Sequence, residues 1–450
     1  MARSLELPYK AATRCEDRYA WFDAIRPLGW PVFLDSGDPA RSGGRYDILA
    51  AAPSAVTTSR EGAFAAARAL IAGERASGDG WPVSGAVIGY FGYELGRAVA
   101  GLPPAKADAA AFMPEAALGL YPWTVVVDHV ERRAALTSLD SFPLAQAEAL
   151  RDRLLASAAR PLRAFSVDAP VASTLERDAY LPRARRVLDY IEAGDCYQAN
   201  LTREFRAPCS GDPWSFYRYL HDTNPAPMGA YLEYPFGTVL SSSPERFLVV
   251  DGREVVTRPI KGTRRRRADP AEDAAAAAGL AASPKDRAEN VMIVDLLRND
   301  LGRVCETGSV KVRGLCEVES FATVHHLVST VTGTLTAGLD GLDALEACFP
   351  GGSITGAPKR RAMQIFDELE PHRREVYCGA IGYVAPGGRL DMNIPIRTTL
   401  VAGGELRFYA GGGIVADSTP QDEFDETEAK IAAIRRAIAA FPKVRTAANG

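Results

Sequence analysis

The sequence predicts an α+β fold with extensive antiparallel β-sheet. Short strand-like segments follow one another within residues 228–260 and 377–409, and amphipathic helical patterns occupy other stretches. The first 165 residues contain both kinds of pattern. Strands that run in series, beside helices grouped elsewhere, are typical of this class.

The first region is expected to span residues 1–165. Apolar and β-branched runs predict strands over residues 31–36, 45–50, 85–93 and 121–128. Helices are predicted over the alanine-rich residues 62–72 and over residues 144–159. Residues 160–176 contain proline, alanine and serine without a clear period, so we place a boundary there.

The second region is expected to span residues 175–445. Two of its helices have marked starts, because Ser283 precedes Pro284 and Thr419 precedes Pro420. Helices are predicted over residues 177–193, 283–301, 342–349, 358–369 and 420–440. Strands are predicted over residues 197–202, 377–384, 389–401 and 405–409, with a series of short strands within 228–260.

Composition indicates a globular, reduced protein. The chain has 450 residues, 47% hydrophobic and 24% charged, which is ample for a large core. A net charge of −4 gives nucleic-acid binding no electrostatic support. The seven cysteines contain no CxxC pair, and the sequence shows neither a signal peptide nor an apolar run of membrane-spanning length. We therefore expect a cytoplasmic protein with no nucleic-acid or membrane partner.

Lys261 is the first candidate for chemistry. It lies in the stretch RPIKGTRRRR, just after a strand-like alternation, and Glu245 precedes it in a Ser-Pro-Glu sequence. A lysine and a carboxylate at strand ends can serve as nucleophile and general acid. An exposed lysine on a surface hairpin is the commoner alternative.

Two predicted helices carry carboxylates at helical spacing. Asp286 and Glu289 are three residues apart, as are Glu423 and Glu426, with Lys430 four residues further on. If the two helix faces meet, they form an oxygen-rich site that suits Mg²⁺. Spacing alone favours the alternative of two solvated acidic faces.

Glycine-rich stretches and one arginine form candidate anion sites. Residues 411–413 are three glycines, and residues 351–356 read GGSITG, each shortly before a helix. Arg397 is a candidate for bidentate carboxylate recognition. The alternatives are tight turns and a surface ion pair. His325 and His326 lie in an apolar segment, where buried, hydrogen-bonded histidines are the default interpretation.

These segments together resemble the chorismate-utilising enzymes. The resemblance covers roughly residues 175 to 440 and extends into the N-terminal third, where it is to the aminating branch. Its motifs are AGDCYQANLTR (193–203), SSSPERF (241–247), RPIKGTRR (258–265), KDRAENVMIVDLLRNDLGRV (285–304), HHLVSTVTG (325–333), PGGSITGAPKRRAM (350–363), YCGAIGY (377–383), IPIRT (394–398), AGGGIVADSTPQDEFDETEAK (410–430), FLDSGDPARSGGRYDILA (33–50), GYFGYELGR (89–97) and LYPWTVVVDH (120–129).

The resemblance implies a fold and a branch of the family. The fold is that of anthranilate synthase component I, in which large antiparallel sheets form a sandwich with helices packed outside. The anthranilate-forming branch usually has alanine where this sequence has Lys261. In isochorismate and salicylate synthases a water-activating lysine aligns with Gln198. The resemblance therefore implies amination of chorismate at C4, giving 4-amino-4-deoxychorismate.

The resemblance also implies residue roles. Lys261 attacks C2 of chorismate, Glu245 protonates the departing 4-hydroxyl, and ammonia then adds at C4. Mg²⁺ is held by Glu289 and Glu426, with Asp286 and Glu423 in support. The residues that contact substrate carboxylates are Arg397, Tyr377, Lys430, Gly411, Gly412 and Gly413, and those that line the ring are Ser353, Thr355 and His326.

The expected partners follow from the same resemblance. No cysteine lies in the glycine-rich elbow of a glutaminase, so ammonia is expected from a separate glutamine amidotransferase subunit. A tryptophan site in the first region would include Ser36. Two other functions stay open: formation of anthranilate, and a catalytically silent chorismate-binding subunit.

Overall fold

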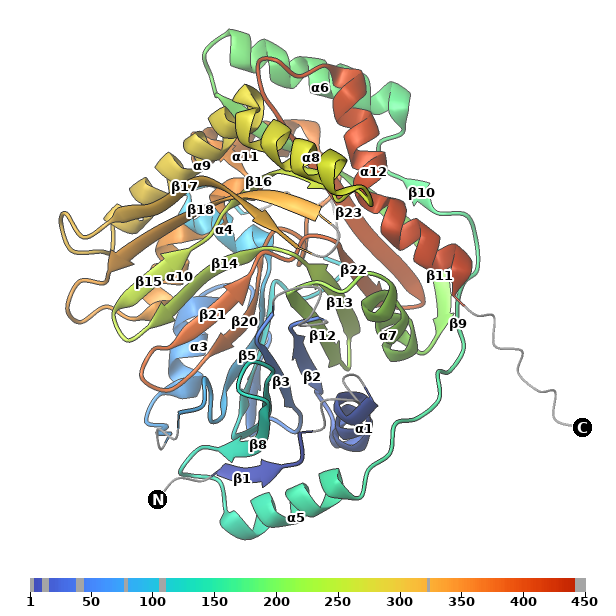
Figure 1. The fold of residues 1–450 in the computed structure, drawn as a ribbon, viewed down its shortest axis with the longest axis vertical. Helices are drawn as coiled ribbons and strands as arrows, with labels where there is room; N and C mark the ends of the chain where they lie inside the picture. Colours follow the sequence, from blue (N-terminus) through green and yellow to red (C-terminus); the bar gives the residue numbers. More distant parts are fainter. Residues whose placement is uncertain are drawn as a thin grey trace, which may run out of the picture.

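The computed structural model describes residues 4–9, 16–37, 44–76, 80–104, 111–321 and 324–441. Two large β-sheets, of 13 and 10 strands, form the body of the molecule, and every recorded strand pairing is antiparallel (Figure 1). The predicted α+β class is therefore confirmed. Cys15 lies outside the described residues.

The larger sheet takes strands from both ends of the chain. Its order is β1 (Ser4–Leu7), β8 (Arg133–Ser138), β7 (Trp123–Asp128), β3 (Tyr46–Ala50), β2 (Val32–Asp35), β12 (Met228–Tyr234), β13 (Gly237–Ser243), β22 (Thr398–Ala402), β23 (Glu405–Ile414), β11 (Gln198–Gly211) and β10 (Ala172–Ser173). Two short strands, β9 (Phe165–Val167) and β19 (Gly356–Ala357), also pair with β11.

The smaller sheet is likewise built from both sides of residues 160–176. Its order is β16 (Ile260–Arg265), β18 (Val324–Thr334), β15 (Glu254–Thr257), β14 (Arg246–Asp251), β21 (Leu390–Asn393), β20 (Ala380–Val384), β5 (Ala86–Phe91), β6 (Ala116–Tyr121) and β4 (Ala55–Thr57). The strand β17 (Lys311–Ser320) pairs with β18.

The helices begin largely where capping residues predict. Ser283 Oγ accepts the Asp286 N–H, and Thr419 Oγ1 accepts the Asp422 N–H. The helices are α1 (Glu16–Ile25), α3 (Ala63–Ile71), α4 (Gly96–Val99), α5 (Leu144–Leu155), α6 (Arg177–Glu192), α7 (Pro213–Thr223), α8 (Pro270–Ala282), α9 (Pro284–Gly302), α10 (Gly341–Cys348), α11 (Lys359–Leu369), α12 (Pro420–Ala440) and the 3₁₀ turns η1 (Arg26–Leu28), η2 (Tyr93–Leu95) and η3 (Gly352–Ile354). Over the described ranges, none of the helices has both the length and the apolar character needed to span a bilayer.

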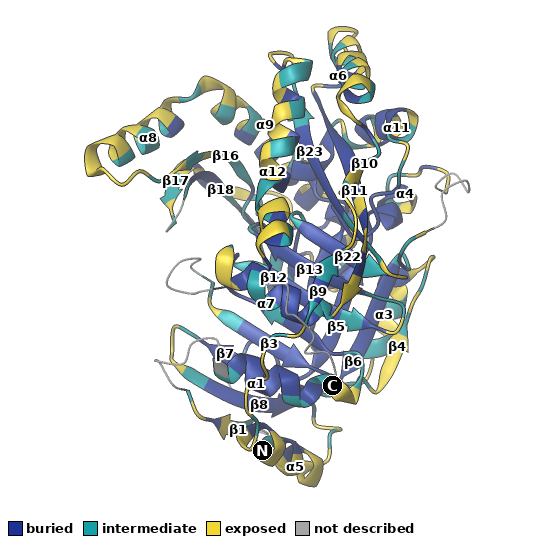
Figure 2. Cartoon of the chain, turned by 90° about the vertical axis from the view of Figure 1, so that its right-hand side faces the viewer, coloured by how far each residue is buried: buried dark blue, intermediate teal, exposed yellow. Residues whose placement is uncertain are grey.

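The larger sheet is buried on both faces because apolar residues occupy consecutive strand positions. Side chains alternate along a strand, so Val32 and Phe33 point to opposite faces. Val32 belongs to the core that also contains Val87 of the smaller sheet, whereas Phe33 packs in a second core with Phe22 of α1 and Trp214 of α7. Figure 2 shows buried strands inside and helices with exposed outer faces.

Three predicted strands differ from the structure. The strand predicted over 389–401 is two strands, because the residues between β21 and β22 leave the ladder and Arg397 has a positive φ of 53°. The strand predicted over 405–409 continues as β23 to Ile414, and the one predicted over 197–202 continues as β11 to Gly211. Gly411–Gly413 are therefore strand residues paired with β11 and do not form a loop after a strand.

Candidate active site

Lys261 lies at a β-bulge near the edge of the smaller sheet. Lys261 pairs with Leu327, and Thr263 pairs with His326, so Gly262 is the extra residue. Gly262 has a φ of +74°, and a Cβ there would lie 2.9 Å from Asp286 Cγ. Both the positive φ and the close approach of Asp286 require glycine at this position. Lys261 is half-buried, and its Nζ lies 3.4 Å from the Ser353 carbonyl oxygen.

Glu245 is the buried acid beside Lys261. It lies in the turn between β13 and β14, is 5% exposed, and accepts a hydrogen bond of 2.7 Å from Ser353 Oγ. Burial raises the pKa of its carboxyl above the ordinary value, although the Ser353 hydroxyl and the positive charge of Lys261 oppose the rise. The structure thus brings a primary amine and a carboxyl with a raised pKa to one place.

The carboxylates of Glu423 and Glu426 on α12 lie beside the glycine run of β23. A Cβ on Gly412 would lie 2.5 Å from Glu423 Oε2 and 3.7 Å from Glu426 Oε1. Burial raises the pKa of Glu289, and the charge of Glu426 raises it further against the opposing charge of Lys261. The charges of Lys261 and Glu426 both act on Glu289, so the two acidic helix faces lie within electrostatic reach of each other, while the Glu426 side chain stays 49% exposed.

The four acidic residues are not equivalent. Glu423 is 3% exposed; its Oε1 accepts from Ser418 Oγ at 2.6 Å, whereas its Oε2 has no hydrogen-bond partner among the described residues. Asp286 pairs with Arg264 at 2.8 Å. Over the described part of the chain, no group of three or more His, Cys, Asp or Glu side chains has metal-binding geometry.

Lys430 links α12 to strand β23, which carries Gly411–Gly413. Its Nζ lies 2.6 Å from Glu426 Oε1 and donates to the Gly411 carbonyl at 2.7 Å. Burial would raise the pKa of Glu426, but Lys430 and Lys261 hold it below the ordinary value.

Strand β22 pairs with β23 only as far as Phe408, so within the described residues the edge of β23 at Gly411–Gly413 has no strand partner on that side.

Arg397 and His326 lie together. Burial lowers the pKa of the Arg397 guanidinium, and no acidic side chain in the described ranges forms an ion pair with it. Burial and the charge of Arg397 lower the pKa of His326 to about 4, and its Nδ1 lies 2.9 Å from Thr263 Oγ1. A cation without a counter-ion beside a neutral histidine can receive an anionic ligand.

The remaining predicted residues have internal partners. Tyr377 is 4% exposed and stacks on Tyr409 with ring centroids 5.3 Å apart. Thr355 Oγ1 donates to the Gly351 carbonyl at 3.0 Å. Ser36 donates from both its N–H and its hydroxyl to Asp47 Oδ1, at 2.8 and 2.6 Å, in a buried network outside the group around Lys261.

Gln198 is a further candidate site residue. In the sequence it was noted only as the position that aligns with the water-activating lysine of isochorismate and salicylate synthases. Its side chain is fully buried at the start of β11, and neither its Nε2 nor its Oε1 has a hydrogen-bond partner among the described residues. A Cβ on Gly413 would lie 2.5 Å from Gln198 Nε2. A buried amide without partners is costly unless a ligand or water satisfies it.

Arg374 holds the loop that carries Ser353. It is fully buried and donates to both carboxylate oxygens of Glu370, at 2.9 and 2.7 Å, and to the carbonyls of Asn200 and Ile354, at 2.6 and 3.1 Å. It thereby ties the loop before α11 to strand β11. No local sequence pattern indicated this role.

We expect Arg374→Met to lower the free energy of unfolding by about 3–5 kcal/mol, because Glu370 would keep a buried, unpaired charge. Chemical denaturation measures the loss. The Glu370→Gln, Arg374→Met double variant should recover part of it, and Arg360→Met, at an exposed position of α11, should change stability by less than about 0.5 kcal/mol. Equal losses for Arg374→Met and Arg360→Met would contradict the interpretation.

Comparisons with known proteins agree on one family. The family model described as "chorismate binding enzyme" matches residues 31–436. The chain is 44% identical over 430 residues to aminodeoxychorismate synthase component 1 of Klebsiella aerogenes, covering 91% of this chain and 94% of that protein. It is 44% identical over 382 residues to anthranilate synthase component 1 of Streptomyces coelicolor, covering 80% and 74%. The crystal structure of anthranilate synthase component I from Streptococcus pneumoniae superposes with a TM-score of 0.76 at 30% identity, covering 86% and 91%.

Proposed function

This chain belongs to the chorismate binding enzyme family, and from that premise we propose that it is the chorismate-aminating component of an aminodeoxychorismate synthase. It would convert chorismate and ammonia to 4-amino-4-deoxychorismate and water. The observation that supports this choice is the Lys261 amine beside the buried Glu245 carboxyl. An amine in that position provides a nucleophile other than water.

The reaction proceeds in two displacements. The neutral Lys261 amine attacks C2 of chorismate, the ring double bonds shift, and the C4–O bond breaks as Glu245 gives its proton to the leaving hydroxyl, which departs as water. Ammonia then forms a bond to C4, the double bonds shift back, and the C2–N bond to Lys261 breaks. The new ammonium group returns one proton to Glu245, so acid and nucleophile are both regenerated.

We assign one substrate carboxylate to Arg397 and another to Lys430 at the open edge of β23. Arg397, whose guanidinium has no ion pair among the described residues, would bind one carboxylate. Lys430 and the open edge of β23 would approach another. Ser353 keeps Glu245 oriented toward the ring, and the orphaned Gln198 amide lies over Gly413 of β23.

The residues present fit a magnesium ion. Glu423 has one buried carboxylate oxygen without a partner among the described residues, Gly412 leaves room for Glu423 and Glu426, and the charge of Glu426 acts on the Glu289 carboxyl. Mg²⁺ requires only one or two protein carboxylates and takes its other ligands from water and substrate. Glu289 and Glu426 would hold it, with Glu423 and Asp286 in support. When bound, Mg²⁺ supplies positive charge that stabilises electron density drawn toward the ring carboxylate.

We expect Glu426→Gln to raise the Mg²⁺ concentration needed for half-maximal activity by at least about 10-fold, because one anionic ligand is lost. Titration of Mg²⁺ into protein treated with EDTA measures the shift. Asp425→Asn is the matched control, since Asp425 is exposed on the same helix and its Oδ1 accepts from Gln421. An unchanged requirement in Glu426→Gln would remove this residue from the ligand set.

A second subunit is proposed as the ammonia source. The relative from Klebsiella aerogenes is named component 1, which implies a further component. All six cysteines of the described residues are buried, so none is placed as an accessible glutaminase nucleophile. We infer a glutamine amidotransferase partner, with free ammonium as a substitute in the test tube.

Anthranilate formation is the second candidate, because a relative of equal identity carries that name. Purified protein is incubated with chorismate, Mg²⁺ and ammonium at mildly alkaline pH, and the products are identified by mass and fluorescence. Aminodeoxychorismate, which a lyase converts to 4-aminobenzoate, is the expected product. Fluorescent anthranilate would overturn the proposal, and binding of chorismate without turnover would favour a silent subunit.

A further inference from the structure

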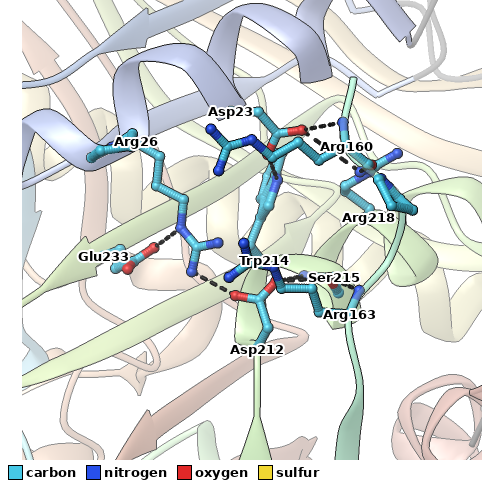
Figure 3. Close-up of a pocket in the computed structure, with 11 residues that line it drawn as sticks. Asp23, Arg26, Arg160, Arg163, Asp212, Trp214, Ser215, Arg218 and Glu233 are labelled. Carbon is cyan, nitrogen blue, oxygen red and sulfur yellow. Dashed lines mark hydrogen bonds and ion pairs between the residues drawn. The ribbon is translucent and has the colours of Figure 1, made fainter. Parts of the chain in front are cut away.

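A separate cavity of about 240 Å³ lies between α1, α7 and the segment that follows α5. Charged side chains dominate its lining, and none of them belongs to the group around Lys261 (Figure 3). They comprise four arginines and three acids: Arg26, Arg160, Arg163, Arg218, Asp23, Asp212 and Glu233. We call this cavity the arginine pocket.

The three acids of the arginine pocket are already satisfied. Asp23 accepts from Trp214 Nε1 and from the Arg160 N–H, both at 2.9 Å. Asp212 accepts from Arg26 at 2.6 Å and caps α7. Glu233 accepts from Arg26 Nε at 2.6 Å. Asp23 Oδ2 also lies 3.9 Å from Arg218 Nη1. The three carboxylates therefore pair with Arg26 and Arg218, whereas the side chains of Arg160 and Arg163 have no acidic partner among the described residues.

The arginines are only partly satisfied. Arg160 and Arg163 are exposed, and their backbone N–H groups are bound by Asp23 and by Ser215 Oγ, but their side chains form no ion pair within the described ranges. The Arg218 Nε is buried and has no hydrogen-bond partner there. Figure 3 shows the Arg160 and Arg163 side chains extending from the chain segment toward the side of the pocket where Arg26 lies.

We propose that the arginine pocket binds the phosphate group of a small ligand. Arg26 uses Nε and Nη2 for Glu233 and Asp212, which leaves its Nη1 outside these two ion pairs, and Arg160 and Arg163 supply the guanidinium groups without an acidic partner. Guanidinium groups from separate positions suit a tetrahedral phosphate, whereas a single guanidinium fork already pairs with a planar carboxylate. Four arginines face three acids, so the lining carries one excess positive charge that favours an anion, and the two anchored backbone amides hold the arginine-bearing segment in place before binding. The ligand would bridge η1 and the segment between α5 and β9.

The test is a calorimetric titration of the full chain with inorganic phosphate, glycerol 3-phosphate and acetate at constant ionic strength without Mg²⁺. We expect saturable one-site binding of phosphate or of its ester but not of acetate. Arg160→Gln, Arg163→Gln should weaken it at least 10-fold. The control Arg313→Gln, Arg436→Gln removes two exposed arginines elsewhere and should leave it unchanged. Comparison of the two phosphate probes distinguishes free phosphate from a phosphate monoester.

Arg397→Gln separates this pocket from the candidate active site. Retained binding in Arg397→Gln, together with slower hydrogen exchange over residues 157–164 in the presence of the ligand, supports the proposal. Loss of binding in Arg397→Gln but not in the Arg160, Arg163 double variant would overturn it. Equal affinity in the double variant and the wild type, or a response that tracks ionic strength alone, would also overturn it and indicate an adventitious ion only.

Discussion

Lys261→Ala is expected to lower the rate of aminodeoxychorismate formation by about 100-fold or more, because the proposed first bond to C2 can no longer form. Binding of chorismate should change far less, since Arg397 and the β23 edge are untouched. Steady-state rates with ammonium, combined with a direct binding measurement, separate the two effects. In the wild type, mass spectrometry of protein mixed with chorismate without ammonia should detect an adduct of chorismate minus water on the peptide that contains Lys261.

Two further variants decide whether Lys261 acts as a nucleophile or only as a charge. Lys261→Arg keeps the positive charge near Glu289 and Glu426 but lacks an amine that can attack at neutral pH. It should be as inactive as Lys261→Ala. Lys311→Ala, at an exposed position of β17, controls for loss of a lysine and should retain activity. Activity of Lys261→Arg close to that of the wild type would refute the covalent role.

All seven predicted helices are present because their signals are local, whereas α1, α7 and α8 were not predicted. Caps at Ser283 and Thr419 and apolar spacing along the chain are contained within a few residues, and α9 and α12 begin where those signals lie. The glycine run of β23 was misjudged for the opposite reason. Glycine is needed there because a Cβ would collide with Glu423 or Gln198, which are distant in sequence. The strand conformation of these glycines has no local sequence signature.

The same distinction applies to the candidate site. Lys261, Glu245 and Glu289 were identified through motifs, although composition and spacing alone favoured solvated surfaces. Three other features depend on contacts between segments far apart in the chain. They are the bulge at Gly262, the buried amide of Gln198 without partners, and the hydrogen bonds by which Arg374 ties the loop before α11 to β11. The arginine pocket combines residues of α1, α7, β12 and the segment after α5, none of which carries a motif.

Glu245→Gln is expected to lower kcat/KM by about 10²–10⁴-fold, because the leaving hydroxyl loses its proton donor. In the wild type the acid must be protonated to act, so kcat/KM should fall as pH rises through the pKa of Glu245. Burial raises that pKa, which shifts this alkaline limb above the range of an ordinary glutamate. A pH–rate profile of kcat/KM reports the pKa values of the free enzyme and measures the limb.

Ser353→Ala provides the matched test of the same assignment. The Ser353 hydroxyl donates to Glu245 Oε1 at 2.7 Å and stabilises the charged carboxylate, so its removal should raise the pKa of Glu245 further. The alkaline limb should then move to higher pH, whereas a variant that merely loosened the loop would lower the rate at every pH equally. An unchanged limb in Ser353→Ala, with Glu245→Gln still active, would mean that another group protonates the leaving hydroxyl.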